Sequence, residues 1–368
     1  MAIQTALDSI SNSSGSPFGF KNRIINGAMV IDQRNAGASY TITGDQQYGS
    51  VDRFMARIYG GPGRFSMQQV TDAPADFLKS LKVTVTTTDT SGTYGYSVEQ
   101  RIEGLNITDF NFGTASAATY TMSFWVKASI AGTYTCGNRT TSGTSSCVNT
   151  YTINSANTWE KKTIVFPANT GFTTGTDNGV GLICDFGFGP QTSKSTSTLG
   201  EWQSGNYLFN SGQVDLMATS GATFYITGVQ LEKGSTATSF DYRPYGTELA
   251  LCQRYFEKSY QQGTSIGSSG TGNTGQTLYI GTGNIVGSGD KLPNTTFMVT
   301  KRTAPTVNTW SPNGTANTLA NMSGTDLATN SCTPNVANDR SFFANNATSS
   351  VTGSLGCVQF QWSASAEL

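Results

Sequence analysis

The sequence contains no histidine, and its charged residues are few. Without histidine the chain lacks the usual general base near neutral pH, the commonest transition-metal ligand and every Ser-His or Cys-His nucleophile pair. Asp, Glu, Lys and Arg make up 12% of the 368 residues, against about 25% in a typical globular protein. Most familiar hydrolases are therefore excluded, and paired carboxylates or Lys and Tyr chemistry are the catalytic options that remain.

The few charges are also evenly mixed, with 22 basic and 23 acidic residues and a net charge of -1. Phosphate backbones and anionic lipids need clustered Lys and Arg, so we expect neither nucleic acid nor a membrane surface as a partner. The first 20 residues lack the basic and apolar regions of a signal peptide, and no long apolar run follows. We expect synthesis in the cytoplasm and no membrane insertion.

Cysteine spacing gives no sign of a zinc site, because the six cysteines contain no CxxC pair. We predict buried thiols and no cofactor or metal. One disulfide is possible, because Cys136 and Cys147 flank GNRTTSGTSS. This segment could be a hairpin loop that brings the two cysteines opposite each other. A structural calcium ion is conceivable in a sandwich of this kind, but no DxDxDG loop is present and no ligands are assigned.

Short alternating runs separated by Gly, Ser, Thr and Asn predict an all-β sandwich over about 21–242. The clearest strands are 81–88 and 120–126. In the second of these, Met122, Phe124 and Val126 share one face, and Trp125 lies on the other face with Thr121, Ser123 and Lys127. Further strands are expected at 53–59, 94–102, 163–166, 181–188 and 224–231.

One segment has helical spacing. Thr247 can cap a helix in which Leu249, Cys252 and Phe256 recur on one face, and the helix should end before Gly263. A Gly- and Ser-rich stretch follows, and then strands at 277–286, 296–301, 306–310, 340–344 and 356–363 predict a second, C-terminal β-sandwich.

Three stretches together resemble tailed-bacteriophage tail-fibre and receptor-binding proteins: NRIINGAMVIDQRNAG at 22–37, the segment 226–260 that contains RPYGTELALCQRYFEKSY, and TKRTAPTVNTWSPNGT at 300–315 with the ending FQWSASAEL. Between them, YTMSFWVKAS, WEKKTIVF and FYITGVQLEKG are similar to strands of jelly-roll domains related to carbohydrate-binding modules. The resemblance covers nearly the whole chain, and the junction RPYGTELALCQRYFEKSY is its most specific part.

The resemblance implies a virion protein, a homotrimeric tail fibre that attaches a phage to a bacterial surface polysaccharide without catalysis. It divides the chain into a virion-attachment segment (1–21) that binds tail proteins, a jelly-roll sandwich (22–244), a helical junction (245–262) and a receptor-binding β domain (263–368). Three helices could meet on the fibre axis through Leu249, Cys252 and Phe256. The helix could equally pack on its own sandwich.

Candidate glycan-binding residues are aromatic side chains on the solvent face of a strand, because a sugar ring stacks its apolar face on an aromatic plane. The alternation places Tyr279 and Trp310 there in the last domain, with Phe343 beside Arg340, and Trp125 in the jelly roll. A trimer interface could cover the first four, and Trp125 could instead pack under a loop.

A polysaccharide depolymerase, either a glycosidase or a lyase, is the main alternative function. Glu99, Glu103, Asp185 and Glu201 could supply a carboxylate pair in the first sandwich, although surface or loop positions are the default expectation for such acids. Between 263 and 366 the only acids are Asp290, Asp326 and Asp339. We therefore expect no enzyme and assign no catalytic residue. A structural spacer or decorating fibre is the third possibility.

Overall fold

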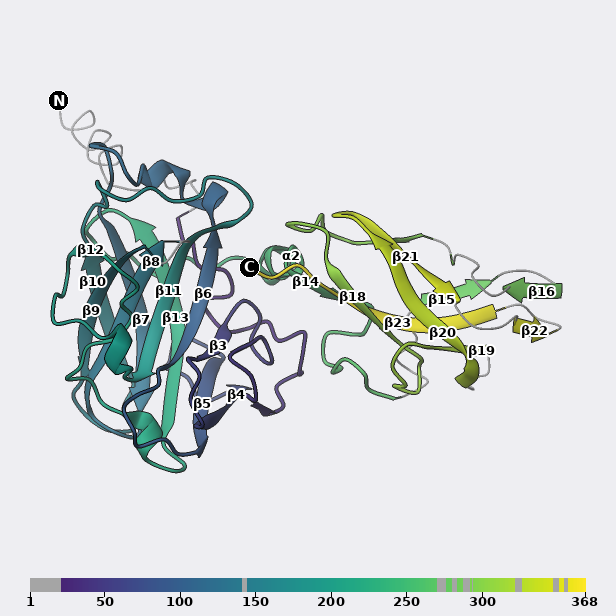
Figure 1. The fold of residues 1–368 in the computed structure, drawn as a ribbon, viewed down its shortest axis with the longest axis horizontal. Helices are drawn as coiled ribbons and strands as arrows, with labels where there is room; N and C mark the ends of the chain where they lie inside the picture. The colour runs from purple at the N-terminus through teal and green to yellow at the C-terminus, as the bar shows by residue number, and fades with distance from the viewer. Residues whose placement is uncertain are drawn as a thin grey trace. The chain divides into compact units, whose positions relative to one another are not determined.

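The computed structural model describes residues 21–140, 144–269, 276–279, 283–286, 292, 294–321, 326–346, 351–353 and 357–368. These residues form two compact units. The first contains the chain up to Val30, then Gly37–Arg243 and Leu368, and the second contains Ile31–Ala36 and Pro244–Glu367. Both units are built from antiparallel strands, with one short α-helix among the described residues (Figure 1). The predicted all-β fold is confirmed, and the virion-attachment segment 1–20 lies outside the described residues.

The first unit is a sandwich of two antiparallel sheets. Sheet A contains, in spatial order, β1 (Tyr40–Thr41), β4 (Arg64–Val70), β5 (Ser80–Thr87), β13 (Thr223–Lys233), β7 (Tyr120–Ala128) and β10 (Glu160–Phe166). Sheet B contains β12 (Trp202–Ser204), β9 (Ser145–Ile153), β8 (Gly132–Thr140), β11 (Val180–Gly189), β6 (Tyr96–Glu103), β3 (Met55–Ile58) and β2 (Gln46–Gln47). Short 3-10 helices lie in the connections: η1 (Gly104–Asn106), η2 (Thr108–Phe110), η3 (Thr192–Lys194) and η4 (Leu216–Ala218).

The core of this unit lies between the sheets and follows the period of two in each strand. In β7 the side chains of Met122, Phe124 and Val126 are fully buried between the sheets, as the sequence predicts. The Phe124 ring meets Phe186 of β11 edge to face at 5.1 Å between centroids. The other face of β7 points away from the core and carries Ser123 and Trp125, so sheet A presents an outer face with an aromatic side chain.

β8 and β9 form an antiparallel hairpin. The sequence interpretation treated GNRTTSGTSS as loop because it is rich in turn-forming residues, but much of it belongs to these two strands. The pairing sets Cys136 opposite Asn149 and Cys147 opposite Asn138. The two thiols are therefore offset by two positions, and both are buried and free. Cys136 and Cys147 therefore form no disulfide at this hairpin.

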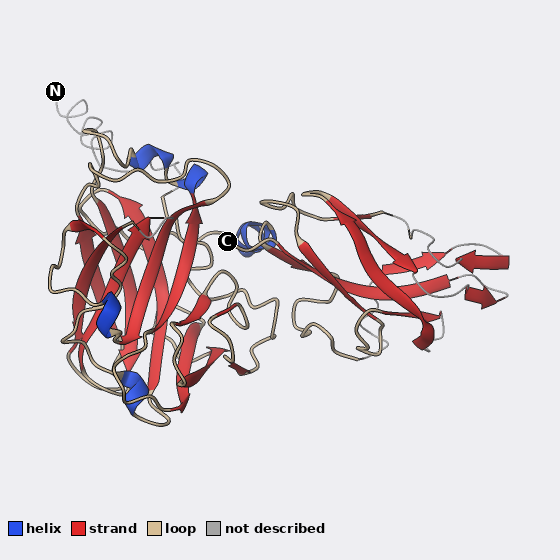
Figure 2. Ribbon diagram, in the orientation of Figure 1, coloured by secondary structure: helices blue, strands red, loops and turns tan. Residues whose placement is uncertain are grey.

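The second unit is a curled half-barrel sheet rather than two stacked sheets (Figure 2). Its strands follow the order β14 (Phe256–Lys258), β23 (Cys357–Ser365), β19 (Thr318–Asn321), β20 (Asp326–Ala337), β21 (Ser341–Asn346) and β17 (Thr295–Thr296), and β15 (Gln276–Tyr279) and β18 (Thr306–Trp310) also pair with β23. A separate two-stranded sheet pairs β16 (Gly283–Val286) with β22 (Val351–Gly353). The core gathers around Phe297, Phe342 and Trp362.

The helix α2 (Tyr245–Gln253) begins and ends earlier than predicted. Pro244 precedes its first residue, where the missing N–H of proline costs no helical hydrogen bond. The prediction that Phe256 shares the helical face is wrong, because Phe256 starts β14 and pairs with Ser365 of β23. Backbone pairing with a long central strand outweighs the helical propensity of this short segment.

The second unit also contains a segment that precedes it by more than 200 residues, Ile31–Ala36. The Arg34 guanidinium lies 3.8 Å from the centroid of the Phe256 ring and forms an ion pair with Glu367 at 3.0 Å. Gln33 donates a hydrogen bond to the Phe256 carbonyl oxygen at 2.8 Å. The early segment therefore completes the packing around β14.

Candidate functional site

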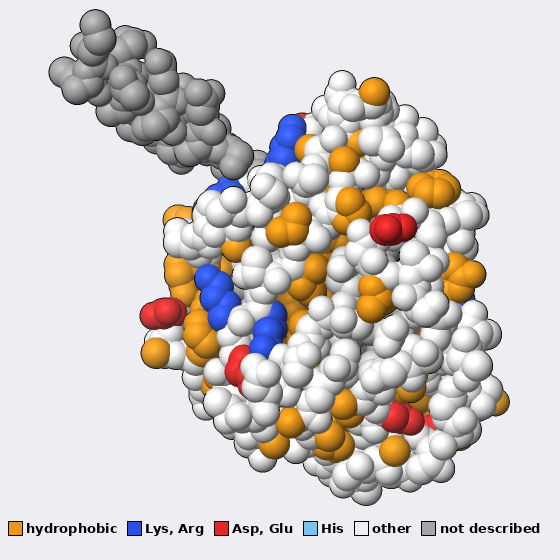
Figure 3. Space-filling model, turned by 90° about the vertical axis from the view of Figure 1, so that its left-hand side faces the viewer, with side chains coloured by type: hydrophobic (Ala, Val, Ile, Leu, Met, Phe, Trp, Pro, Cys, Tyr) orange, Lys and Arg blue, Asp and Glu red, His pale blue; other side chains and the backbone are white. Residues whose placement is uncertain are grey.

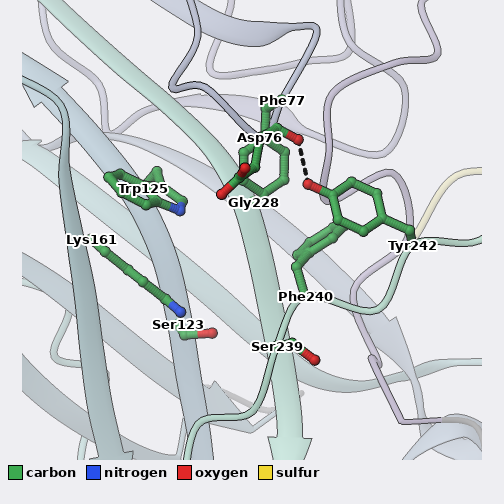
Figure 4. Close-up of a pocket in the computed structure, with 9 residues that line it drawn as sticks. All are labelled: Asp76, Phe77, Ser123, Trp125, Lys161, Gly228, Ser239, Phe240 and Tyr242. Atoms are coloured by element: carbon green, nitrogen blue, oxygen red, sulfur yellow. Dashed lines mark hydrogen bonds between the residues drawn. The ribbon is translucent and has the colours of Figure 1, made fainter.

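A pocket of about 590 Å³ lies on the outer face of sheet A. Figure 4 shows its walls, with Trp125 and Lys161 on one side and a group of aromatic rings on the other. The lining residues come from β7, β10, β13 and two flanking segments: Asp76, Phe77, Ser123, Trp125, Lys161, Gly228, Ser239, Phe240 and Tyr242. Strands of a rigid sheet thus form the floor, and loops form one wall.

A β-bulge in β13 makes room for the aromatic wall. The pairing of β13 with β7 shifts between Thr227 and Gln230, and Gly228 within the bulge has a φ of 61°. That left-handed conformation favours glycine. A Cβ atom on Gly228 would lie 2.6 Å from Cζ of Phe77, so the ring could not keep its position over the strand with any other residue there.

Three rings form the aromatic wall: Phe77, Phe240 and Tyr242. The Phe240 and Tyr242 centroids are 4.8 Å apart, and Phe77 lies 5.1 Å from Phe240 and 5.6 Å from Tyr242. The Tyr242 hydroxyl donates a hydrogen bond to the Asp76 backbone oxygen (Figure 4). This bond ties the segment after β13 to the segment before β5, and it leaves Tyr242 with 57% of its surface exposed.

Buried polar side chains of β13 hold the second of these segments in place. Gln230 accepts a hydrogen bond from the Asp241 backbone at 2.8 Å and donates to the Ser239 carbonyl at 3.2 Å. Glu232 accepts from both the backbone and the hydroxyl of Thr238, at 2.9 and 2.7 Å. Because these groups are satisfied, the chain that carries Phe240 and Tyr242 is fixed in the free protein.

Several polar groups of the pocket make no hydrogen bond or ion pair with the residues that the structure describes. No hydrogen bond or ion pair joins any of the following to another residue in the described ranges: the indole N–H of Trp125, the ammonium of Lys161, the carboxylate of Asp76 and the hydroxyls of Ser123 and Ser239. Aromatic planes and unbonded donors and acceptors therefore line the same cavity, an arrangement that suits a polar ligand with apolar ring faces.

Other polar groups on the same outer face are paired. Lys127, two residues after Trp125, forms an ion pair with Asp72, and its ammonium lies 4.3 Å from the centroid of the Tyr225 ring. Asp72 also accepts a hydrogen bond from the indole N–H of Trp159 at 3.1 Å. In the space-filling view, most of the visible surface is uncharged, and two basic side chains and an acidic one lie close together near its middle (Figure 3).

The residues predicted from the sequence are distributed over both units. Trp125 is half-buried and lines the pocket. In the second unit Trp310 is half-buried, with its centroid 6.2 Å from that of Tyr260, and Arg340 is exposed. Phe343 is half-buried on the face opposite the core residue Phe342.

Tyr279 lies in β15, and its side chain is outside the described part of the chain. Of the junction residues, Cys252 and Phe256 are buried within their own unit and Leu249 is half-buried. The trimer junction and the second-unit glycan site stay predictions.

Two of the acids that the sequence offered as a carboxylate pair do meet, but on the outer face of sheet B. Glu99 of β6 and Asp185 of β11 are directly opposite each other, and neither is exposed. The default expectation of surface or loop positions is wrong for both. Arg139 of β8 bonds Glu99 at 2.7 Å and Asp185 at 3.1 Å, so a guanidinium group compensates the buried charge.

The two carboxyls have opposite pKa shifts. Burial raises the pKa of Asp185 to about 7, with Arg139 opposing the rise and Glu99 adding to it. Burial acts the same way on Glu99, but Arg139, Arg101 and Arg57 outweigh it and hold the Glu99 pKa below its usual value. Tyr59 also faces this cluster through its hydroxyl, which accepts a bond from Arg139 at 3.1 Å.

Stability should therefore fall as the pH rises from about 4 to about 7. The folded-state pKa of Asp185 lies above the ordinary value of 3.8, so folding favours the protonated form and ionisation at higher pH opposes it. We expect the free energy of unfolding to decrease by up to about 1.4 kcal/mol per pH unit between the two pKa values and to level off above pH 7, where Asp185 is ionised in both states. No histidine is present to titrate in this range.

Chemical denaturation between pH 5 and 8 measures this slope and its levelling off above pH 7, and Asp185→Asn should remove the slope. Asp76→Asn, which changes an exposed carboxylate in the pocket, is the control and should keep it. An unchanged slope in Asp185→Asn would contradict the assignment.

Within the described ranges, no group of three or more Cys, Asp or Glu side chains is arranged to hold a metal ion. Nor does that part of the chain contain a helix long and apolar enough to cross a membrane.

No protein-family model matches the sequence, and no curated protein matches it. Among solved structures, the enzymatically active domain of bacteriophage CBA120 tailspike protein 4 is similar over 58% of this chain and 21% of its own length, with 14% identity and a TM-score of 0.31.

A family 22 carbohydrate-binding module of Clostridium thermocellum Xyn10B covers 55% of this chain and 99% of its own length, with 15% identity and a TM-score of 0.28. A family 11 module from Clostridium thermocellum, in complex with a β-1,3-1,4-mixed-linked tetrasaccharide, covers 54% and 98%, with 13% identity and a TM-score of 0.27. The chain is thus similar to carbohydrate-binding-module β-sandwiches, and we derive its function from the pocket.

Sequence reasoning found Trp125 and missed the opposite wall. Phe77 follows PAD in a long connection, and Phe240 and Tyr242 flank an aspartate in SFDYRP after the last strand of the sandwich. Aromatic residues in such polar connections were the available signal. Their meeting depends on the bulge at Gly228, which the sequence does not reveal.

Proposed function

We propose that this protein binds a bacterial surface glycan without cleaving it, as the receptor-binding protein of a tailed-bacteriophage tail fibre. The observation that carries the glycan assignment is the pocket on sheet A, where Trp125 and Tyr242 lie on opposite sides and several lining polar groups have no partner in the described part of the chain. Its volume of about 590 Å³ falls within the roughly 300–1,000 Å³ typical of small-ligand sites. The phage assignment is supported by the sequence resemblance, above all at the junction after the sandwich.

The absence of catalysis is supported by where the carboxylates lie. Glycoside hydrolysis usually needs two carboxyl groups on either side of the scissile bond. Among the residues that the structure describes, Asp76 is the only acid that lines the pocket. Glu99 and Asp185 are fully buried on the outer face of the opposite sheet, bonded to Arg139, and no substrate can reach them in this conformation.

The fibre organisation belongs to the same proposal. A homotrimer would carry copies of each site, and copies held on one fibre bind a repeating surface polymer far more tightly than a single site does. Attachment to virion tail proteins through residues 1–21 would orient those sites toward the host, and the second unit would form the distal end.

Purified bacterial capsular polysaccharides test the proposal. The full chain is incubated with each polymer, retention on polysaccharide-coupled beads measures binding, and size-exclusion chromatography measures the polymer length. We expect retention on at least one polymer with no change in its length. Progressive shortening of the bound polymer would establish the depolymerase alternative instead, and no retention on any polymer would contradict glycan binding.

A further inference from the structure

The lysines of β7 and β10 differ in whether their charge is compensated. Lys127 forms an ion pair with Asp72, and Lys162 forms one with Glu160 at 2.6 Å. Lys161, which points into the pocket, has neither an ion pair nor a hydrogen bond with any residue in the described ranges. Both strands are described completely, and Lys161 is the one lysine on them whose ammonium has no counter-charge among the described residues.

The position of Lys161 defines one end of the pocket. The register of the sheet sets Lys161 directly beside Trp125, and Ser123 is its diagonal neighbour on the same face. Figure 4 shows the ammonium extending toward Ser123, away from the wall that carries Asp76. The pocket therefore has a cationic end, where Lys161 lies with the Ser123 hydroxyl, and a carboxylate end, where Asp76 lies beside the aromatic rings.

We infer that the pocket selects a sugar residue that bears a carboxylate, such as a uronic acid in an acidic capsule. This inference rests on the proposed function. The ligand carboxylate would accept hydrogen bonds from Lys161 and Ser123, and the sugar ring would lie against Trp125. The ring hydroxyls would then donate to Asp76 at the far end, where a second negative charge is repelled.

The charge of the pocket favours a carboxylate over a phosphate monoester. A phosphate monoester carries about -1.5 to -2 at neutral pH, whereas a carboxylate carries one charge, which the single ammonium of Lys161 neutralises. With Asp76 in the same cavity, the additional negative charge of a phosphate would meet no cation among the lining residues.

Acidic capsular polysaccharides in native and carboxyl-reduced form test the selection. Reduction converts each uronic acid to a neutral hexose and leaves the linkages intact. We expect the full chain to bind the native polymer about tenfold more tightly than the reduced one, the effect of one charge-assisted hydrogen bond. Raising the salt concentration should weaken only the binding of the native form.

Lys161→Gln should lose this preference, binding the native polymer about tenfold more weakly and the reduced one unchanged. The matched control is Lys162→Gln, which makes the same change in net charge on the same strand but at a lysine paired with Glu160, and it should keep the preference.

Equal binding of the two polymer forms, or equal losses in the two variants, would overturn the inference and leave glycan binding intact. If neither form of any polymer binds, the proposed function itself fails and the inference with it.

Discussion

Replacing Trp125 by alanine should weaken glycan binding about 30-fold, the effect of losing about 2 kcal/mol at an aromatic hot spot. Trp125 supplies the aromatic plane on the side of the pocket opposite Phe240 and Tyr242, and its indole N–H has no partner among the residues described. Its side chain lies on the outer face of β7, outside the sandwich core, so the variant should fold. Isothermal titration calorimetry with a polysaccharide that the unaltered chain binds measures the change in affinity. Thermal unfolding shows whether the variant folds.

Trp310→Ala is the matched control for this experiment. Trp310 is also a half-buried tryptophan on a strand, but it lies in the second unit, packed against Tyr260. If the pocket on sheet A is the binding site, Trp310→Ala should bind as the unaltered chain does. Loss of binding in Trp310→Ala together with full binding in Trp125→Ala would move the site to the second unit.

Replacing Arg139 by alanine should destabilise the first unit by about 3–5 kcal/mol, as expected when one member of a buried ionic group is removed. The Arg139 side chain is 8% exposed and bonds both Glu99 and Asp185, which are not exposed at all. Its loss leaves Asp185 without an ion-pair partner among the described residues, and leaves Glu99 with Arg101 and Arg57. Chemical denaturation at pH 7 measures the difference in free energy of unfolding.

A second variant background separates the effect of the unpaired carboxylates from the effect of the packing lost with Arg139. In a chain that already carries Glu99→Gln and Asp185→Asn, the same Arg139→Ala change leaves no carboxylate unpaired, and it should cost much less. An equal loss in both backgrounds would show that Arg139 stabilises the sheet by packing alone.

The strands that the sequence predicts well are those with strict alternation. The strand expected at 120–126 appears as β7 (Tyr120–Ala128), with Met122 and Phe124 buried, and 306–310 is β18 without change. Predictions failed where local composition opposes the final pairing. β20 contains Pro334 beside a register shift, and a proline is tolerated in a strand at such an irregularity. The strand expected at 296–301 shortens to Thr295–Thr296.

The candidate site, too, could be predicted only where a single strand determines the position of a side chain. Alternation alone places Trp125 on the outer face, because one strand suffices for that conclusion. Phe77 and Tyr242 are separated by more than 160 residues, and their closeness depends on the order of strands in sheet A. Likewise, Glu99 and Asp185 were among four acids that could pair, and only the register of β6 with β11 selects them.

The segment Ile31–Ala36 affects how such proteins can exchange parts during evolution. Recombination that swaps the second unit as one contiguous cassette from Pro244 onward leaves Arg34 behind in the recipient. The incoming Phe256 and Glu367 would then rely on whatever side chain the recipient carries at position 34. A transplanted second unit should therefore keep these two contacts only if it carries residues 31–36 with it or meets an arginine at position 34.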